Sequence, residues 1–326
     1  MRCLLVDRTT DGKIVRQLTE NPLAELPAGE ILVRVQYSSL NYKDALAATG
    51  HPGVVNQFPH VPGIDAAGTI VESKNSLFKV GEEVIVTSFN LGAGQWGGLA
   101  EYIRVPAEWV VPLPKGLSLR ESMILGTAGF TAAMCLEAIV RQQIGPECGE
   151  VVVTGASGGV GTIAVAILSL AGYKVCAISG KPTVANLLRK LGAVEVLPRE
   201  AVVDSSRKPL LKPRWAAAID TVGGSTLATL LASLQPLGCV AACGLVGGVD
   251  LPTTVYPFIL RGVTLSGIDS AWYPAALRPA LWSKLAGPWK PAMLNELATE
   301  VSLGQIEPKI DEILAGKTVG RIVVKI

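Results

Sequence analysis

The hydrophobic pattern of the chain changes near residue 125. Before that point, short runs in which apolar and polar residues mix, such as EILVRVQYSSL, AAGTIVES, GEEVIVTS and LAEYIRVP, are separated by proline and glycine. This pattern is typical of strands joined by tight turns. The sequence therefore predicts a compact β-rich domain over residues 1–124, with few long helices.

From residue 125 to 270, apolar strands alternate with helical stretches. The strands read EVVVTG, YKVCAIS, VEVL, AAAID, CVAACGL and VTLSGID, and we expect helices over 160–171, 183–191 and 225–234. Strands that are apolar throughout are buried on both faces, as in a parallel sheet covered by helices. The predicted fold class is α/β, with a doubly wound Rossmann domain at 125–270. Residues 271–326 end in the strand-like GRIVVKI, which we expect to return to the first domain.

Composition and charge narrow the classes of partner. The 29 basic and 27 acidic residues are interspersed and give a net charge of +2, which offers little attraction for nucleic acid or anionic lipid. Apolar stretches such as IAVAILSLAG stop short of the roughly 18 residues that a membrane span needs. The N-terminus has too few consecutive apolar residues for a secretory signal, and the six cysteines form no CxxC pair. We therefore expect a cytoplasmic protein with a small-molecule partner, and no nucleic-acid or membrane partner.

The segment VVVTGASGGVGTIAVAIL joins a predicted strand to a predicted helix. From Ala156 it reads A-x-G-x-x-G, with Gly158 and Gly161 at the second and third positions of the dinucleotide fingerprint. Small residues let the backbone approach a pyrophosphate, and the helix start supplies N–H groups and a positive dipole end. Glycines often only make turns, but here the required strand and helix flank the motif. The predicted phosphate-binding residues are Ser157, Gly158, Gly159 and Val160.

The end of the next strand indicates which nicotinamide cofactor binds. NAD sites place a carboxylate there, on the ribose 2′-hydroxyl. This chain has Ser179, Gly180 and Lys181 instead, and Arg199 follows the third strand. A hydroxyl and two cations suit a 2′-phosphate, so NADPH is the predicted cofactor. The alternative is that Lys181 and Arg199 are ordinary solvated cations.

The chain offers few ligands for a metal. Its only histidines, His51 and His60, lie in a loop rich in proline and glycine, and no cysteines have zinc-site spacing. Catalytic zinc takes three protein ligands and structural zinc takes four. We therefore predict no metal site. The G-x-S-x-G elbow of serine hydrolases is also missing.

Longer stretches resemble a known family. The segments SSLNYKDALAATG, FPHVPGIDAAGTI, WGGLAEYIRV, ILGTAGFTAAMCLEA, VAACGLVGG and LPTTVYPFILRGVTLSGIDS are similar to the NADPH-dependent acrylyl-CoA reductase group of the zinc-independent medium-chain dehydrogenase/reductases. The similarity runs from about residue 1 to residue 326. At the positions of zinc ligands in zinc-binding members, this chain carries Asn41, Ile64 and Thr127.

The resemblance implies both an architecture and an activity. It implies a GroES-like catalytic domain, a cleft between two domains, and a homodimer paired through edge strands of the nucleotide domain. It also implies reduction of the carbon–carbon double bond of a short 2-enoyl-CoA, with acrylyl-CoA to propionyl-CoA as the favoured reaction. The alternatives are a quinone or enone oxidoreductase on the same fold and a protein that senses NADPH without catalysis.

Without a metal, the enolate oxygen formed by hydride addition needs hydrogen-bond donors. The predicted catalytic residues are therefore Tyr42, Asn41 and Asp44. Tyr42 and the Asn41 amide are suitable donors, whereas we expect Asp44 to orient Tyr42, Lys43 or a ribose hydroxyl. The proton for the α-carbon comes from Tyr42 or from water.

The same segment also reads as a helix start. Asn41 suits an N-cap, Asp44 occupies the acidic position of a capping box, and Gly50 suits the helix stop. The two roles are compatible, because a capped helix start can still present donors to a ligand. Further predicted cofactor contacts are Tyr42, Thr127, Leu245, Ile259 and Ser270.

Overall fold

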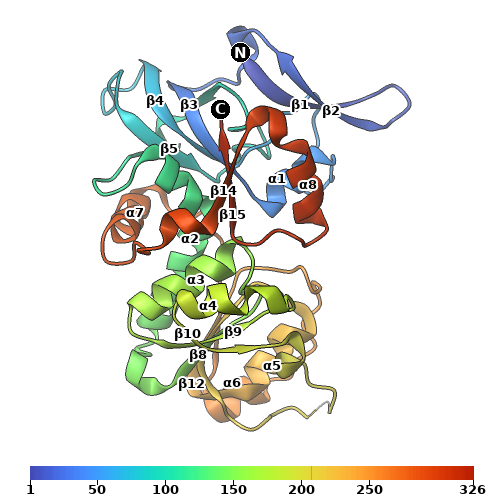
Figure 1. Ribbon diagram of the computed structural model, residues 1–326, viewed down its shortest axis with the longest axis vertical. Coiled ribbons are helices and arrows are strands. Elements are labelled where there is room, and N and C mark those ends of the chain that lie inside the picture. The colour runs from blue at the N-terminus through green and yellow to red at the C-terminus, as the bar shows by residue number, and fades with distance from the viewer. Residues whose placement is uncertain (207) are drawn as a thin grey trace. The chain divides into compact units, whose positions relative to one another are not determined.

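The computed structural model describes residues 1–206 and 208–326, and the chain forms two compact units (Figure 1). Unit 1 comprises Met1–Thr127, Ser270–Gly287 and Leu294–Ile326. Unit 2 comprises Ala128–Asp269 and Pro288–Met293. The first unit is therefore assembled from both ends of the sequence.

Unit 1 is built on a seven-stranded sheet in the order β14-β15-β3-β4-β5-β7, with β6 paired to β3. The C-terminal strand lies in this sheet, because β15 pairs antiparallel with β3 and places Ile322 opposite Leu40. A separate hairpin is formed by β1 and β2. The strands are β1 (Arg2–Arg8), β2 (Ile14–Glu20), β3 (Ile31–Leu40), β4 (Asp65–Ser73), β5 (Glu83–Thr87), β6 (Tyr102–Val105), β7 (Val110–Pro112), β14 (Ala298–Ser302) and β15 (Arg321–Lys325).

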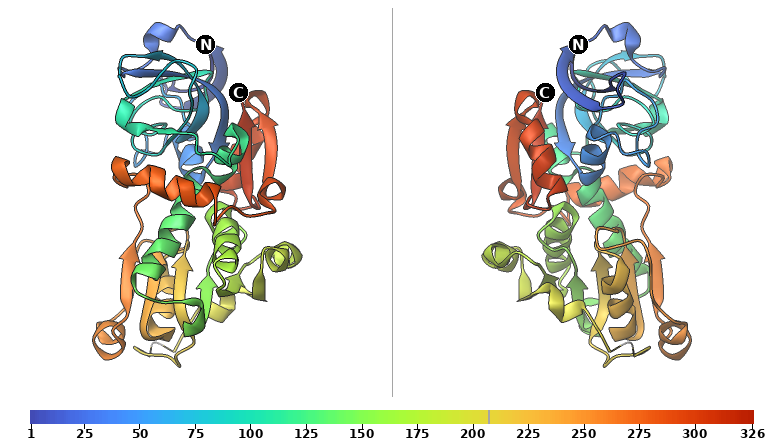
Figure 2. Two further views of the ribbon diagram at one scale, coloured as in Figure 1. Left: turned by 90° about the vertical axis from the view of Figure 1, so that its left-hand side faces the viewer. Right: turned by 90° about the vertical axis from the view of Figure 1, so that its right-hand side faces the viewer.

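One core of unit 1 is formed by short helices and the C-terminal strands. The helices of this core are α1 (Tyr42–Ala48) and α8 (Glu307–Leu314), and unit 1 also contains α7 (Arg278–Ala286). Alternate residues of β15, Ile322 and Val324, join Leu40 and residues of α1 and α8 in one buried cluster. Figure 2 shows α8 beside the strands β14 and β15. The alternation of β15 thus decides which of its side chains meet α1 and α8.

Unit 2 holds a six-stranded parallel sheet in the order β10-β9-β8-β11-β12-β13. Counted along the chain this is the order 3-2-1-4-5-6, so the predicted Rossmann fold is confirmed. Helix α3 packs on β8 and β9, and α5 packs on β11 and β12 (Figure 2). The elements are β8 (Glu150–Val153), α3 (Gly159–Leu170), β9 (Lys174–Ile178), α4 (Ala185–Lys190), β10 (Ala193–Leu197), β11 (Trp215–Asp220), α5 (Gly224–Ser233), β12 (Leu234–Ala242), α6 (Tyr256–Arg261) and β13 (Thr264–Gly267).

Helix α2 (Leu119–Arg141) is longer than the sequence pattern indicates. By length and composition, α2 is long and apolar enough to cross a membrane. The apolar stretches predicted from the sequence are shorter and did not indicate this helix. However, 78% of its most apolar window is buried inside the structure, as in the core helix of a globular domain. Gly126 also breaks the helix, with φ 51° and ψ −156°.

The break at Gly126 is required by its surroundings. A Cβ atom built on Gly126 would lie 2.5 Å from Asp65 Oδ2, 2.9 Å from Ser39 Oγ and 3.0 Å from Arg321 Nη2. These backbone angles are also nearly restricted to glycine. Position 126 therefore tolerates no side chain unless its neighbours move.

We expect Gly126→Ala to lower the free energy of unfolding by about 3 kcal/mol or more, because it combines backbone strain with overpacking. Gly12→Ala is the matched control: Gly12 has φ 84°, but an added Cβ would meet nothing within 4 Å. The control should lose only about 1–2 kcal/mol. Denaturant unfolding measures both, and equal losses would show that the contacts around Gly126 are unimportant.

Candidate active site and nucleotide site

Helix α1 begins where strand β3 ends, and the predicted cap is present. Asn41 is the N-cap, and its backbone N–H donates to Asp44 Oδ2 over 2.7 Å. Gly50 has φ 68°, directly after the C-cap residue Thr49. The interpretation of this segment as a capped helix start is therefore confirmed.

The Asp44 carboxylate does not have the role expected from the sequence. It is fully buried, and its Oδ1 accepts hydrogen bonds from the backbone N–H groups of Gly63 (3.1 Å) and Ile64 (2.7 Å). None of its described hydrogen bonds is with Tyr42 or Lys43, and a contact with a ribose hydroxyl stays a prediction. Asp44 instead connects α1 to the loop before β4, because its carboxylate accepts hydrogen bonds from buried backbone N–H groups of that loop.

Asp65, the first residue of β4, is the acceptor shared by several elements. It is fully buried and accepts from Thr127 N–H at 3.0 Å and Thr127 Oγ1 at 2.6 Å. Ser39 Oγ (2.6 Å) and Asn41 Nδ2 (2.8 Å) also donate to it. Thr127 follows the break in α2, so Asp65 lies at the start of a second helical segment, where a negative charge is favoured.

Arg321 enters the same cluster from β15 and is itself buried. Its Nη1 donates to Asn41 Oδ1 over 3.1 Å, and its Nη2 donates to Ser39 Oγ over 2.8 Å. Both ends of the Asn41 amide are therefore used inside the protein. The Asn41 N–H groups donate to Asp65 and Asp44, so donation from this amide to a substrate oxyanion, which stays a prediction, would compete with these contacts.

We define the Asp65 cluster as Ser39, Asn41, Asp44, Asp65, Thr127 and Arg321. Burial, together with the negative charge of Asp65, raises the pKa of Asp44 to about 7. Burial lowers the pKa of Arg321, and the nearby carboxylates oppose that shift. The buried charges of the cluster are thus stabilised by hydrogen bonds rather than by water.

Sequence reasoning missed three members of this cluster: Ser39, Asp65 and Arg321. The available signal was a single charged residue inside an apolar strand, as in PGIDAAG and GRIVVKI. Of the positions that correspond to zinc ligands, Asn41 and Thr127 belong to the cluster, and Ile64 contributes a backbone N–H to Asp44. Among the described residues, no three His, Cys, Asp or Glu side chains are grouped to hold a metal.

Tyr42 and Ser270, two other predicted site residues, also lie in unit 1. Tyr42 follows the N-cap, and 42% of its surface is exposed, so its hydroxyl can meet a ligand. The Ser270 carbonyl accepts a 2.9 Å bond from Arg278, a buried arginine. Thr127 Oγ1 lies 2.9 Å from Ser88 Oγ, and Ser88 has the positive φ of 67°. A contact of Tyr42, Thr127 or Ser270 with the cofactor stays a prediction.

The glycine turn of unit 2 has the expected strand and helix, with one correction. The residue with positive φ is Gly155, at 57°, so the tight turn lies one residue before Ala156. Gly158 is the N-cap of α3, and a Cβ on Gly161 would lie 2.6 Å from Ala156 Cα. The third glycine therefore permits close packing of the helix on the turn, as the fingerprint requires.

The residues predicted to hold a 2′-phosphate lie together in unit 2. The Arg199 side chain lies directly against Gly180, where an added Cβ would be 2.7 Å from Arg199 Cζ. The Ser179 hydroxyl accepts from Lys181 N–H over 3.1 Å. Partial burial and the positive charge of Arg199 lower the pKa of Lys181. Two cations this close repel each other, and a bound anion would relieve the repulsion.

The parallel pairing of β8 with β9 brings Ser157, Gly158, Gly159 and Val160 near Ser179 and Arg199, at the carboxyl ends of the strands. Leu245 and Ile259 are also in unit 2, with 60% and 69% of their surfaces exposed. Leu245 belongs to the loop after β12, and Ile259 belongs to α6. Their cofactor contacts stay predictions.

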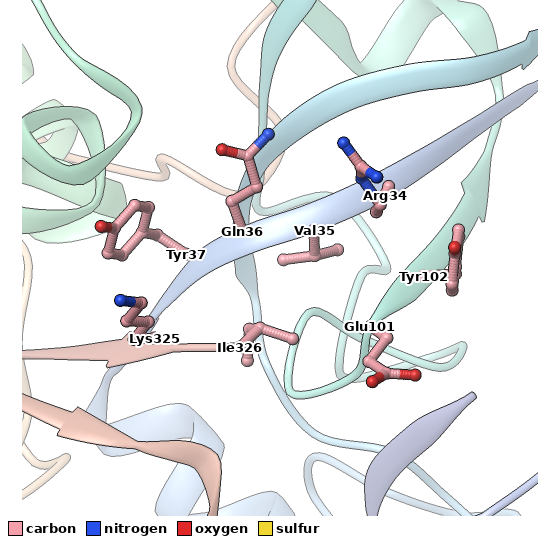
Figure 3. Close-up of a pocket in the computed structure, with 8 residues that line it drawn as sticks. All are labelled: Arg34, Val35, Gln36, Tyr37, Glu101, Tyr102, Lys325 and Ile326. Carbon is pink, nitrogen blue, oxygen red and sulfur yellow. The ribbon is translucent and has the colours of Figure 1, made fainter.

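A surface pocket of about 380 Å³ lies elsewhere in unit 1 and contains none of the predicted site residues (Figure 3). Two strands share one edge of β3: β6 pairs with Ile31–Arg34, and β15 pairs with Tyr37–Leu40. The pocket lies at Val35 and Gln36, where the Val35 N–H donates to the Glu101 carbonyl over 2.8 Å and the Ile326 N–H donates to the Gln36 carbonyl over 3.1 Å. It therefore marks the junction of two segments along β3 rather than a converging set of reactive groups.

Two family models match the chain. The model of the alcohol dehydrogenase GroES-like domain matches residues 27–115, and the model of the zinc-binding dehydrogenase matches residues 159–283. The first match lies within unit 1 and the second lies mainly within unit 2.

Relatives match along nearly the whole chain. A protein of Escherichia coli described as "Probable acrylyl-CoA reductase AcuI" is 46% identical, covering 100% of both chains. The acrylyl-CoA reductase AcuI of Ruegeria pomeroyi is 41% identical, covering 99% of this chain and 98% of its own. YhfP of Bacillus subtilis, which carries a quinone oxidoreductase name, is 47% identical over 93% of this chain and 92% of its own.

Solved structures agree with these relatives. The yhdH oxidoreductase of Salmonella enterica in complex with NADP has a TM-score of 0.97 and 47% identity, with complete coverage of both chains. The Bacillus subtilis protein yhfP with NAD bound has a TM-score of 0.97 and 44% identity, covering 100% of this chain and 99% of its own. The chain belongs to the medium-chain dehydrogenase/reductase superfamily, in the group that contains these acrylyl-CoA reductases and the quinone-oxidoreductase-like YhfP.

The raised pKa of Asp44 predicts a pH-dependent stability. The pKa of Asp44 is about 7 in the folded chain against an ordinary value of 3.8, so the folded state binds more protons between these two pH values. The contribution of Asp44 is therefore fully present below about pH 4 and is lost as the pH rises through 7. We expect Asp44→Asn to remove this loss, which is on the order of a few kcal/mol.

The measurement is denaturant unfolding of both proteins at pH 5 and pH 8. Asp250→Asn is the control, because Asp250 is exposed and lies outside the cluster. The wild-type protein and the control should lose more stability between the two pH values than Asp44→Asn. A variant with the same pH dependence as the wild-type protein would contradict the assignment to Asp44.

Proposed function

We propose that the protein reduces the carbon–carbon double bond of a short 2-enoyl-CoA with NADPH, with acrylyl-CoA to propionyl-CoA as the favoured reaction. The observation that carries this proposal is the full-length similarity to acrylyl-CoA reductases. Fold alone would not support it, since one fold serves many reactions. The local arrangement of cofactor and site residues adds independent support.

The residues of unit 2 fit NADPH. The turn at 157–160 and the start of α3 would hold the pyrophosphate, because helix N-termini attract anions. Ser179, Lys181 and Arg199 would hold the 2′-phosphate, whose negative charge would offset the mutual repulsion of the two neighbouring cations. When bound, NADPH supplies the hydride.

Addition of hydride to the β-carbon of the enoyl thioester leaves negative charge on the thioester oxygen. The hydroxyl of Tyr42, a partly exposed residue at the start of α1, would donate a hydrogen bond to that oxygen. Loss of one such donor typically costs about 2.7–4 kcal/mol of transition-state stabilisation. The α-carbon takes its proton from Tyr42 or from water, and Asn41 and Asp44 hold the helix start in place.

The proposed reaction uses no zinc. The amide of Asn41, the alkyl chain of Ile64 and the hydroxyl of Thr127 are not the thiolate, imidazole or carboxylate ligands that zinc takes. Two of these three residues are also hydrogen-bonded within the Asp65 cluster. Charge stabilisation therefore comes from hydrogen-bond donors.

We also propose that the protein works as a cytoplasmic homodimer. Strand β13 is an edge strand of the unit 2 sheet, and exposed strand edges readily pair with another chain. Apolar side chains are exposed on and beside α6, which precedes β13, namely Val255, Tyr256 and Leu260. All six cysteines are free, which suits a reducing compartment.

Turnover of three substrates tests the proposed activity. NADPH oxidation is followed at 340 nm with saturating acrylyl-CoA, crotonyl-CoA and a benzoquinone. We expect turnover with the CoA esters and little with the quinone. Turnover of the quinone alone would establish the oxidoreductase alternative, which the name of YhfP favours. Tight NADPH binding without turnover of any of the three would identify a sensor.

Lys181→Ala tests the cofactor assignment. It removes one charge-assisted hydrogen bond to the 2′-phosphate, worth about 1.5–3 kcal/mol. We expect the Kd for NADPH to rise about tenfold or more and the Kd for NADH to change little, as measured by fluorescence titration. Lys190→Ala, an exposed position on α4, is the control. Equal weakening of both cofactors would show that Lys181 does not contact the 2′-phosphate.

A further inference from the structure

Arg321 is an unusual residue for the interior of unit 1. Its guanidinium is buried, and burying a charge is costly unless its donors find partners. Nε donates to the Ile124 carbonyl over 2.9 Å, and the two terminal nitrogens donate to Asn41 Oδ1 and Ser39 Oγ. The Asp65 carboxylate lies 3.8 Å away and balances the charge.

These partners come from three different elements. Ser39 and Asn41 are at the end of β3, Ile124 is in the first part of α2, and Asp65 begins β4. A planar guanidinium has donors in a fixed fork and can serve several directions at once. A lysine ammonium at the same position is a single point charge on a flexible chain. The geometry therefore requires arginine in particular.

The bond to Asn41 determines how that amide is oriented. Because Arg321 donates to Oδ1, the Nδ2 group must point the other way, toward Asp65 and Asp44. The orientation of the N-cap side chain is then fixed from both ends. Tyr42 is the next residue in the chain, so its backbone position at the helix start depends on the same contacts.

We propose that Arg321 is a positioning residue, which fixes Asn41 and through it places Tyr42 for the reaction. The expected effect of Arg321 on kcat rests on the proposed function, whereas its expected effect on the helix start does not. The guanidinium is a permanent internal cation beside the positions that correspond to zinc ligands in zinc-binding relatives. It organises those side chains by hydrogen bonds, where a metal would do so by coordination.

Arg321→Met and Arg321→Lys test the proposal. We expect kcat with acrylyl-CoA to fall about 100-fold in Arg321→Met, since small misplacements of catalytic groups cost this much. The KM for NADPH should change less than threefold in both variants. Arg321→Lys keeps the charge and should fold even where Arg321→Met does not; its kcat should be intermediate.

The control is Arg120→Met. Arg120 is also in unit 1 and is held by Glu300 and Asn295, at 2.6 Å each, outside the Asp65 cluster. Its loss should lower the thermal unfolding temperature and leave kcat unchanged when measured well below that temperature. Wild-type kcat in both Arg321 variants, or an equal fall of kcat in the control, overturns the proposal.

A double-mutant cycle with Tyr42→Phe tests whether Arg321 acts through Tyr42. Tyr42→Phe alone should lower kcat more than it weakens NADPH binding. If Arg321 only positions Tyr42, then Arg321→Met should lower kcat much less in the Tyr42→Phe background than in the wild-type protein. Fully multiplicative effects would overturn the route through Tyr42.

Chemical rescue adds a test of the cation itself. Guanidinium chloride at low, non-denaturing concentration should restore part of kcat to Arg321→Ala, whereas urea, which is planar but neutral, should not. Equal effects of the two compounds would show that the charge is not needed and would overturn the proposed role.

Hydrogen exchange supplies a readout that does not depend on the reaction. The amides of α1 should exchange faster in Arg321→Lys than in the wild-type protein or in Arg120→Met. If the wild-type protein reduced none of the three substrates, the proposed function would fail while this result could still support positioning. Unchanged exchange in α1 would overturn positioning even in an active enzyme.

Discussion

The buried carboxylate of Asp65 is the constraint around which unit 1 is organised. A charge without solvent must be surrounded by donors, and here they come from β3, from the N-cap of α1 and from the restart of α2. Arg321 of β15 balances the charge from 3.8 Å away. Each of these elements is held in register by a contact to one residue. The glycine at 126 follows from the same requirement, because the space beside the carboxylate is already full.

Much of the architecture could be predicted from the sequence because its signals are local. The strands and turns of unit 1, the alternating strands and helices of unit 2, the glycine turn and the cap at Asn41 each depend on neighbouring residues. The true partners of Asp44 and Asn41 could not be predicted. Arg321 is 280 residues from Asn41 along the chain, and no periodic pattern records that distance. The length of α2 was missed because its break at Gly126 looks like a turn.

Membership of the superfamily explains the fold, but the two units carry different parts of the functional argument. In unit 2, the residues that fit a nucleotide lie at the carboxyl ends of neighbouring strands. Unit 1 has a polar centre, in which opposite charges are buried together. Such a centre is stable only as a whole, since removing one partner leaves another charge uncompensated. Replacement of Asn41 or Thr127 would therefore be costly, because each side chain bonds to Asp65 and Asn41 also bonds to Arg321.

The close approach of Arg199 to Gly180 has a consequence for how cofactor use can evolve. Any side chain at 180 would push the guanidinium away from the strand end. Aspartate there would do so and would also supply the carboxylate that NAD sites place on the ribose 2′-hydroxyl. A single base change converts a GGU or GGC glycine codon into an aspartate codon. One substitution at position 180 would therefore change both the placement of Arg199 and the charge at this strand end, without rebuilding the fold.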